Sequence, residues 1–353
     1  MTDRQEGAWA PPAPRFATVA LVATVLVTGG LGFIGSNFVH HLCAHTDHDA
    51  IVVDKLGYAA RRDSLAGLPA DRVEVVIGDI CDAEITDATV ARVDAVVHFA
   101  AESHNDNSIL GPGEFVRSNV LGTYEVLEAV RRHGVRLHHI STNEVYGDLA
   151  LDDPTRFTAQ TPYRPSSPYS ATKAGSDHLV RAWVRTFGVA ATISNCSNNY
   201  GPRQHVEKFI PRQITNLIDG VRPRVYGRGA NVRDWIHVDD HSSAVLTILE
   251  SGQIGETYLI GADGERSNLA VVRELLAIFG RDVDDFDQVA DRAGHDLRYA
   301  IDAGALRDQL GWSPVRVDFT AGLRDTVEWY RENEDWWRGV KSETEAKYRR
   351  SGQ

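Results

Sequence analysis

Short apolar runs alternate with longer amphipathic segments through the first half of the chain. The runs are rich in β-branched residues and predict strands at 24–28, 50–54, 73–77, 95–99, 137–141 and 191–195. Between them, the patterning predicts helices at 33–44, 114–133 and 169–187. Wholly apolar strands that alternate with helices are typical of a parallel sheet covered on both faces. We therefore expect an α/β fold built on a doubly wound parallel sheet.

The alternation weakens after residue 195, where glycine, proline and charged residues become denser. At 353 residues the chain also exceeds the usual limit for a single hydrophobic core. We expect a large domain at 24–195 and a smaller α/β domain at 196–353, with segments that interleave. Residues 1–23 contain Pro11, Pro12 and Pro14 and are predicted to form a disordered extension.

Composition narrows the choice of partners and compartment. The chain has 37 Lys and Arg against 49 Asp and Glu, a net charge of −12, which disfavours nucleic acids and anionic membranes as partners. Its three cysteines form no metal-binding or disulfide pattern, which fits a reducing cytoplasm and predicts no metal site. The apolar segment at 16–27 is shorter than the roughly 18 residues of a membrane span. Signal-peptide cleavage there would remove the strand that the following glycine turn needs.

The segment 25–35 combines a strand, a glycine-rich turn and the start of a helix. Gly29 allows the tight turn, Gly32 lets backbone N–H groups approach a pyrophosphate, and Gly35 lets the helix pack closely on the strand. Asp54 closes the next strand about twenty positions later, where a carboxylate binds the ribose 2′-hydroxyl of a dinucleotide. Because a carboxylate disfavours the 2′-phosphate of NADP, the motif predicts a Rossmann-type site for NAD, although two arginines at 61 and 62 temper that preference.

Tyr169 and Lys173 stand four positions apart at the start of a predicted helix and therefore share one of its faces. A tyrosine has an ordinary pKa of about 10 and is a poor base at neutral pH unless positive charge stabilises its phenolate. Lys173 and an oxidised nicotinamide would supply that charge, so that Tyr169 takes a hydroxyl proton while the carbinol carbon gives hydride to NAD. Such a pair arises by chance in many helices, and the glycine motif upstream is what favours catalysis.

The segment 141–147 follows another predicted strand. Polar side chains at the carboxyl end of a parallel strand lie in the crevice where open α/β sheets bind ligands. Glu144 is therefore a candidate base and Thr142 a candidate hydrogen-bond donor. A solvated loop carboxylate without a catalytic role is the alternative, because most glutamates are simply exposed.

With these motifs in place, the sequence resembles the dTDP-glucose 4,6-dehydratase family of extended short-chain dehydrogenases/reductases, from about residue 25 to the C-terminus. The matching segments are 28–35 (TGGLGFIG), 98–103 (HFAAES), 169–173 (YSATK), 195–202 (NCSNNYGP), 232–235 (VRDW) and 294–302 (GHDLRYAID). The last three are much more specific to this family than the glycine motif is.

The resemblance implies a three-stage conversion of a nucleotide-sugar, with dTDP-glucose as the substrate and an NAD that is recycled internally. Tyr169 would assist oxidation at C4, Glu144 would remove the C5 proton, water would leave from C6, and hydride would return to C6. Family members commonly pair through two long helices per subunit, which implies a homodimer built on 114–133 and 169–187. The apolar positions of these helices could equally be buried inside one subunit.

The resemblance also assigns residues by their place in the motifs. The implied catalytic residues are Thr142, Asn143, Glu144, Tyr169 and Lys173. Besides the three motif glycines, the implied cofactor contacts are Phe33, Ile34, Asp54, Asp79, Ile80, Ala100, Ala101, Tyr169, Lys173 and Asn199. The implied substrate contacts are Ser103, Thr142, Asn198, Lys208, Arg233, Asn268, Arg292 and His295. The two arginines suit bidentate binding of a diphosphate, although outside the motifs each would be taken for an ordinary surface charge.

Asn143 is the main departure, because the family has Thr-Asp-Glu where this chain has Thr142-Asn143-Glu144. The family's aspartate protonates the departing C6 hydroxyl, which an amide cannot do. Losing a positioned general acid typically costs about 10² to 10⁴ in rate, so dehydration should be slow while C4 oxidation survives. Three explanations stay open: an engineered substitution, which we favour because the surrounding motifs stay close to the family, a natural homologue with an altered outcome, or compensation by water. Lesser departures are Asn105, Gly57 and Arg203.

Two other functions stay open. A 4-epimerase or a uronic acid decarboxylase of the same superfamily is the nearer one, but Glu144 beside a side chain isosteric with aspartate favours dehydration. The other is a non-catalytic protein that binds a nucleotide-sugar and keeps NAD as a structural ligand. Asn143 alone supports it, and the presence of Tyr169, Lys173 and Glu144 speaks against it.

Overall fold

The computed structural model describes residues 22–291 and 296–350. Its largest element is a seven-stranded sheet with the order β10-β6-β5-β4-β1-β2-β3, in which all neighbouring strands are parallel. The strands are β1 (Thr24–Thr28), β2 (Asp49–Asp54), β3 (Val73–Ile77), β4 (Ala95–His98), β5 (Arg136–Thr142), β6 (Ala191–Cys196) and β10 (Thr257–Ile260). Because the strand order reverses at β1, this is the doubly wound Rossmann-type sheet that the sequence predicts. Each of the six predicted strands is confirmed to within one residue at either end.

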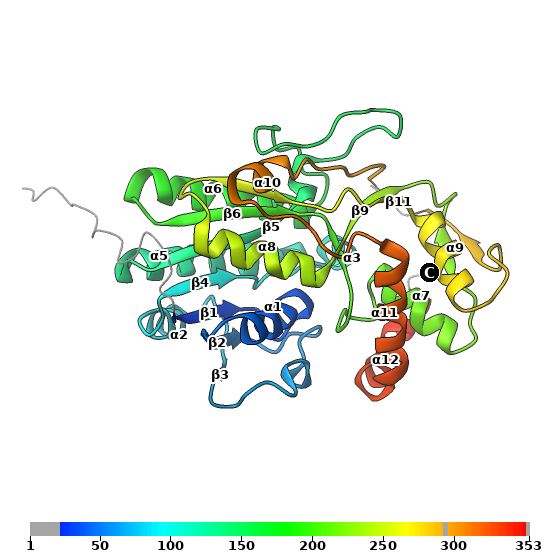
Figure 1. Cartoon of the computed structure of the whole chain (residues 1–353), viewed down its shortest axis with the longest axis horizontal. Helices are drawn as coiled ribbons and strands as arrows, with labels where there is room; N and C mark the ends of the chain where they lie inside the picture. Colours follow the sequence, from blue (N-terminus) through cyan, green and yellow to red (C-terminus); the bar gives the residue numbers. More distant parts are fainter. Residues whose placement is uncertain (1–21, 292–295, 351–353) are drawn as a thin grey trace, which may run out of the picture.

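Helices cover both faces of this sheet (Figure 1). The helices on one face are α1 (Phe33–His45), α8 (Val238–Ser251) and α10 (Gly304–Leu310). Their core includes Phe38, Leu42 and Ile248. The helices on the other face are α2 (Ala83–Val90), α5 (Gly122–His133) and α6 (Pro168–Phe187). Val130 and Val180 pack there, so the central strands of the sheet are buried on both faces, as their apolar residues require.

The predicted helix at 114–133 is a continuous helical stretch, but it is not regular. It consists of α4 (Pro112–Phe115), a π-helical segment η2 (Val116–Leu121) and α5. The π segment contains Asn119, whose amide binds the backbone N–H and carbonyl of Glu102 and the Thr172 hydroxyl. Single π turns are common near functional sites, and the helical periodicity of the sequence does not reveal them.

A second part of the molecule lies beside one end of the large sheet (Figure 1). Its short strands are β7 (Asn198–Tyr200), β9 (Val232–His237) and β11 (Glu265–Ser267) in one sheet, and β8 (Arg224–Tyr226) and β12 (Asp287–Val289) in another. Its helices are α7 (Phe209–Ile218), α9 (Asn268–Ile278), α11 (Phe319–Glu332) and α12 (Glu334–Arg350). They enclose a separate core that includes Tyr200, Trp235, Leu275 and Trp337.

The chain crosses between the two parts more than once. β7 lies in the smaller part, α8 and β10 return to the large sheet, and β11 and α9 lie in the smaller part again. No single cut in the chain therefore separates the two parts, because segments after residue 195 contribute to both. The division into domains at 24–195 and 196–353 stays a proposal. Residues 1–21 of the predicted N-terminal extension lie outside the described residues.

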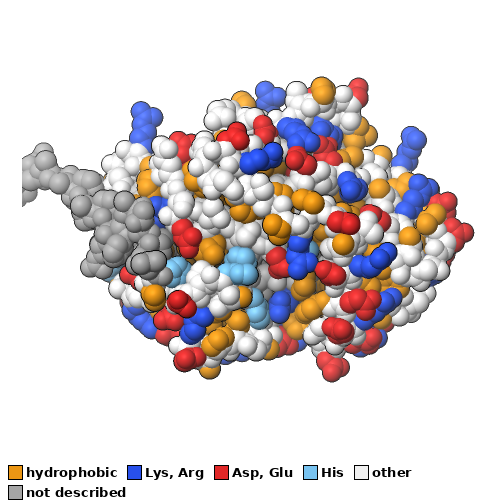
Figure 2. Space-filling model, in the orientation of Figure 1, with side chains coloured by type: hydrophobic (Ala, Val, Ile, Leu, Met, Phe, Trp, Pro, Cys, Tyr) orange, Lys and Arg blue, Asp and Glu red, His pale blue; other side chains and the backbone are white. Residues whose placement is uncertain are grey.

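The surface carries interspersed charges over the described part of the face in Figure 2. Many are paired, as in the contacts of Arg92 with Glu74 and of Arg222 with Asp285. No helix within the described ranges is long and apolar enough to cross a lipid bilayer. Cys43, Cys81 and Cys196 are free thiols, and the part of the chain that the structure describes has no cluster of three His, Cys, Asp or Glu side chains arranged to hold a metal ion.

Candidate active site

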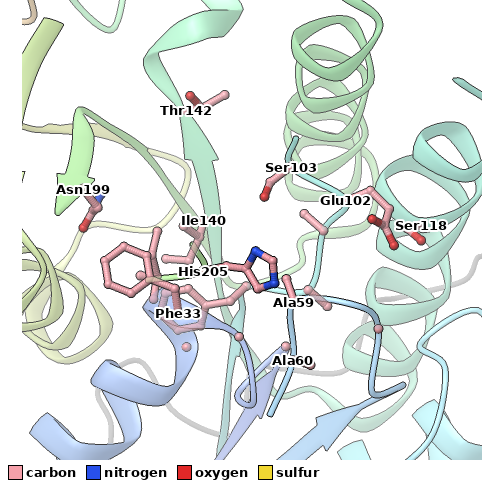
Figure 3. Close-up of a pocket in the computed structure, with 18 of the residues that line it drawn as sticks. Phe33, Ala59, Ala60, Glu102, Ser103, Ser118, Ile140, Thr142, Asn199 and His205 are labelled. Carbon is pink, nitrogen blue, oxygen red and sulfur yellow. The ribbon is translucent and has the colours of Figure 1, made fainter. Parts of the chain in front are cut away.

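A cavity of about 320 Å³ opens where the carboxyl ends of the parallel strands meet. Its walls come from the glycine turn after β1, the loops after β2, β4, β5 and β6, and the start of α6. Figure 3 shows Asn199 on one side of this cavity and Glu102 and Ser118 on the other, with Ile140 and Phe33 between them. This is the crevice at the reversal of strand order where doubly wound sheets bind their ligands.

Two glycines of the turn are required by the local geometry. Gly29 has φ +71, and a Cβ there would lie 2.7 Å from the Ala100 Cα. A Cβ on Gly35 would lie 2.4 Å from the Gly29 carbonyl oxygen, so only glycine lets α1 approach the turn this closely. Gly32 precedes the first turn of α1, and the neighbouring Phe33 and Ile34 line the cavity. The free N–H groups of that turn are suited to a pyrophosphate.

Asp54 lies at the end of β2 and also lines the cavity. One carboxyl oxygen accepts from the Leu31 N–H at 3.1 Å and the other from the Leu56 N–H at 2.9 Å, which holds the group in place. Arg61, one of the two arginines that temper the preference for NAD, donates to Asp63 at 2.8 Å and lies over the Trp336 ring. It is therefore engaged away from the cavity.

Other predicted cofactor contacts line the same cavity, namely Asp79, Ile80, Ala100, Ala101, Tyr169, Lys173 and Asn199. The side-chain oxygens of Asn198 and Asn199 are buried there and have no hydrogen-bond partner among the described residues. Buried polar atoms without a partner are rare unless a ligand satisfies them. These oxygens indicate that the cavity takes a polar ligand, and the glycine turn with Asp54 fits a dinucleotide such as NAD.

The start of α6 positions the predicted catalytic pair. Ser167 caps the helix in a reciprocal arrangement with Ser170, and Pro168 occupies the first turn. Tyr169 is buried, and its pKa is raised well above the ordinary value by burial and by the negative charge of Glu144. A hydrogen bond with Thr142 acts in the opposite direction on this pKa. Tyr169 thus remains a neutral phenol unless positive charge is brought beside it.

Lys173 is the nearby source of positive charge within the chain. Its Nζ donates to the Ile140 carbonyl at 2.8 Å, and burial lowers its pKa to about 8. His139 lies between Lys173 and Asp177, with its Nε2 at 3.4 Å from the lysine Nζ and at 3.3 Å from the aspartate Oδ1. Burial would raise the pKa of Asp177, but its contacts with His139, Lys173 and Tyr163 hold it below its ordinary value. The buried carboxylate therefore helps to keep Lys173 protonated.

Glu144 and Asn143 belong to a 3₁₀ turn, η3 (Asn143–Tyr146), directly after β5. Burial raises the pKa of Glu144, which suits a base that works near neutral pH. Asn105, the first residue of α3 (Asn105–Leu110), donates to the Glu144 Oε2 at 2.9 Å and acts against this shift. The Asn143 side chain is 2% exposed, lines the cavity and has an Nδ2 without a partner among the described residues. That amide is available to a ligand as a donor but cannot supply a proton to a leaving group.

The predicted substrate contacts divide into three groups. Ser103, Thr142, Asn198 and Lys208 line the cavity, and the Lys208 Nζ donates to the Ser103 carbonyl at 3.0 Å. Arg233 and Asn268 do not line it. Arg292 and His295 lie outside the described residues.

Arg233 is buried at 6% exposure and donates to the Asp296 carbonyl at 2.9 Å. Its guanidinium lies 4.4 Å from the centre of the Tyr299 ring. It nevertheless lies close enough to Glu144 to lower the pKa of that carboxyl. In this structure the charge of Arg233 therefore acts on Glu144 from behind the cavity lining, while contact with a diphosphate remains a prediction.

Two polar bridges between side chains that line the cavity could not be predicted from the sequence. Lys55 binds Glu102 at 3.0 Å and Ser118 at 2.9 Å, and the Tyr58 hydroxyl donates to Glu207 at 2.7 Å. The residues of each bridge are far apart in the chain, so no local motif predicts their contact. The bridge between Tyr58 and Glu207 joins the loop after β2 to the segment that leads into α7.

The chain is similar to proteins of known activity. The family model described as GDP-mannose 4,6 dehydratase matches residues 26–326. A dTDP-glucose 4,6-dehydratase of Mycobacterium tuberculosis (strain ATCC 25618 / H37Rv) is 65% identical over 330 residues, which cover 93% of this chain and 99% of that protein. The crystal structure of DesIV, a dTDP-glucose 4,6-dehydratase from Streptomyces venezuelae with NAD bound, matches with a TM-score of 0.86 and 47% identity, covering 90% of this chain and 99% of that one. A UDP-glucose 4-epimerase from Thermotoga maritima matches with a TM-score of 0.81 and 27% identity, covering 88% and 99%.

Proposed function

The chain belongs to the dTDP-glucose 4,6-dehydratases, within the family described as GDP-mannose 4,6 dehydratase, and we propose that it converts dTDP-glucose to dTDP-4-keto-6-deoxyglucose. One observation carries the proposal: Tyr169, Lys173 and the carboxyl Glu144 line the same cavity as the dinucleotide turn. The fold itself does not decide between reactions, because a 4-epimerase shares it.

The proposed mechanism assigns each proton to a group in the cavity. The glycine turn would hold NAD, which would supply the acceptor for the hydride from C4 of the sugar and its donor for C6. Tyr169 takes the C4 hydroxyl proton, and the charge of Lys173 stabilises the phenolate that results. Glu144 then removes the C5 proton, which the new C4 ketone has made acidic. The C6 hydroxyl leaves as water once it receives a proton.

Asn143 limits the last of these steps. Its amide can hold the C6 hydroxyl through a hydrogen bond, but it has no proton to give at neutral pH. We therefore expect oxidation at C4 to proceed and the loss of water to be slow, by about 10² to 10⁴ relative to a site with a positioned acid.

The remaining assignments belong to the same proposal. Asp54, Asp79 and the residues of the turn hold the cofactor, while Ser103, Thr142, Asn198 and Lys208 contact the substrate. The resemblance to the family also assigns Arg233, Asn268, Arg292 and His295 to the nucleotide-sugar, and we keep these four contacts as part of the proposal. We also propose a cytoplasmic location, which the free thiols of Cys43, Cys81 and Cys196 suit.

We also propose a homodimer in which η2, α5 and α6 of two subunits pack together. Val116, Leu121 and Tyr124 expose 53%, 42% and 38% of their surface on this helical stretch, and exposed apolar side chains grouped on one element are suited to a protein interface. Light scattering of the wild-type protein and of Leu121→Glu tests this: the variant should be monomeric, and a wild-type monomer would contradict the proposal.

Product analysis tests the reaction. The protein is incubated with dTDP-glucose, and the nucleotide-sugar is examined by mass spectrometry over time. Loss of one water with retention of the sugar skeleton supports dehydration, whereas an isomer of unchanged mass indicates a 4-epimerase. A transient NADH absorbance that depends on substrate excludes a non-catalytic binder, and Tyr169→Phe is the matched control because it removes only the phenolic hydroxyl.

A further inference from the structure

The side chain of Asn105 connects the candidate base to the helix that carries Tyr169. Its Nδ2 donates to the Glu144 Oε2 at 2.9 Å, and its Oδ1 accepts from the Ser167 hydroxyl at 2.9 Å. Ser167 is the cap of α6, two positions before Tyr169. A single amide therefore joins η3, whose Glu144 lines the cavity, to the start of α6.

The orientation of this amide follows from its two partners. An ionised carboxylate only accepts hydrogen bonds, so the nitrogen of Asn105 must face Glu144. The Ser167 hydroxyl oxygen accepts from the Ser170 N–H at 3.1 Å, which leaves its own proton to donate to the Asn105 oxygen. Both ends of the amide are satisfied in one orientation, and the flipped amide would present an acceptor to a carboxylate.

The orientation of the Glu144 carboxyl group depends on its hydrogen bond from Asn105. Among the residues that the structure describes, Asn105 is the only side chain that donates a hydrogen bond to its carboxyl group. The other ionisable groups around Glu144 act through their charge or burial, and they are Asp296, Arg233, Lys208, Tyr169, Tyr299 and Cys196. Since Asn105 donates, its bond is stronger to the ionised carboxyl than to the protonated one.

We propose that Asn105 is a positioning residue, which holds Glu144 as an oriented carboxylate base for the C5 proton of the sugar. When the proton passes to Glu144, the electron pair of the C–H bond stays on the sugar as the enolate of the C4 ketone. The inference deepens the proposed function and rests on it. It concerns the C5 step, which precedes the proton transfer that Asn143 cannot perform.

The test compares the wild-type protein with Asn105→Leu, which has nearly the same size and no hydrogen-bonding group. Incubation with dTDP-glucose in D₂O measures deuterium incorporated at C5 of the recovered nucleotide-sugar, and NADH absorbance measures the preceding oxidation. The ratio of C5 exchange to NADH formation should fall about tenfold at the acidic end of the pH profile, because a hydrogen bond to a charged group is lost. The acidic limb of the exchange profile should also move to higher pH.

Two further variants separate direct action on Glu144 from a structural effect. Asn105→Asp sets a second carboxylate beside Glu144 and should move the acidic limb to higher pH as well, which keeps the test decisive if Asn105→Leu does not fold. Ser167→Ala removes the cap of α6 and the contact with the Asn105 oxygen while leaving the bond to Glu144, so its acidic limb should stay at the wild-type position.

The outcomes are distinguishable. An acidic limb at the wild-type position in both Asn105 variants would overturn the inference, and so would a Ser167→Ala limb that moves as far as that of Asn105→Leu. A wild-type protein that forms NADH without C5 exchange would refute the role of Glu144 on which the inference depends. If the wild-type protein forms no NADH at all, the proposed function itself is wrong.

Discussion

Replacing Asn143 with aspartate should restore the missing acid. Asn143 follows β5, lines the cavity beside Glu144 and is 2% exposed. Asparagine and aspartate have nearly the same shape, so the exchange changes no packing and creates no cavity. The perturbation is therefore chemical: the Nδ2, which has no partner among the described residues, becomes a carboxyl oxygen that can carry a proton.

The size of the gain follows from the surroundings of position 143. Burial at this depth and the adjacent Glu144 both disfavour a second negative charge, so the new carboxyl should have a raised pKa and stay partly protonated near neutral pH. A positioned acid of this kind contributes about 10² to 10⁴ in rate, equivalent to about 2.7 to 5.5 kcal/mol. We expect dehydration to accelerate within that range, and C4 oxidation to change much less because it does not use this group.

A single-turnover experiment measures both steps. NADH absorbance follows the oxidation, and mass spectrometry of quenched samples follows the loss of water from dTDP-glucose. In Asn143→Asp the NADH signal should decay faster and the dehydrated product should appear with it, while Asn143→Ala, which also lacks an acid, should stay as slow as the wild-type protein. If Asn143→Asp forms NADH normally and gains nothing in dehydration, water or another group already supplies the proton, and our account of position 143 fails.

Four other predictions follow from the site. Tyr169→Phe should reduce NADH formation by about 10² to 10⁴ in stopped-flow measurements, with thermal unfolding confirming that the variant is folded. Because burial lowers the pKa of Lys173 to about 8, NADH formation should decline as pH rises through 8, and in Lys173→Arg this decline should be absent whatever the absolute rate. Gly35→Ala, whose Cβ would meet the Gly29 carbonyl at 2.4 Å, should destabilise the fold by about 1 to 3 kcal/mol and weaken NAD binding, measured by thermal unfolding with and without NAD. Asp54→Asn should bind NAD about tenfold more weakly in a calorimetric titration and should discriminate less against NADP, since the carboxylate that repels a 2′-phosphate is gone.

The large sheet was predictable because most of its strands are buried on both faces and rich in β-branched residues, and therefore appear as runs in the sequence. β8, β11 and β12 have three residues each, which is too short for a pattern to stand out, and β10 pairs with β6 only after a long excursion through the smaller part. The π segment at 116–121 was missed for a different reason, since it changes the helix geometry without changing the type of residue that is buried.

In the site, too, features set by local sequence were predictable, and features set by long-range contacts were not. Gly29, Gly35, Tyr169 and Lys173 could be found from spacing, because one turn and one helix face bring them together. The bridge between Tyr58 and Glu207 joins residues 149 positions apart, and tertiary folding alone makes them neighbours. Their contact depends on where the loop after β2 and the segment before α7 run, which no local pattern specifies.

Two amides next to Glu144 explain why the steps of the reaction should proceed at very different rates in this protein. Asn143 precedes the carboxyl in the chain, Asn105 donates to it, and neither can release a proton at neutral pH. Oxidation at C4 requires Tyr169 and Lys173, and removal of the C5 proton requires Glu144, so both steps keep the groups that they need. Departure of the C6 hydroxyl requires an acid that these amides do not provide. The 4-keto sugar should therefore form readily and dehydrate slowly, and NADH should accumulate during turnover.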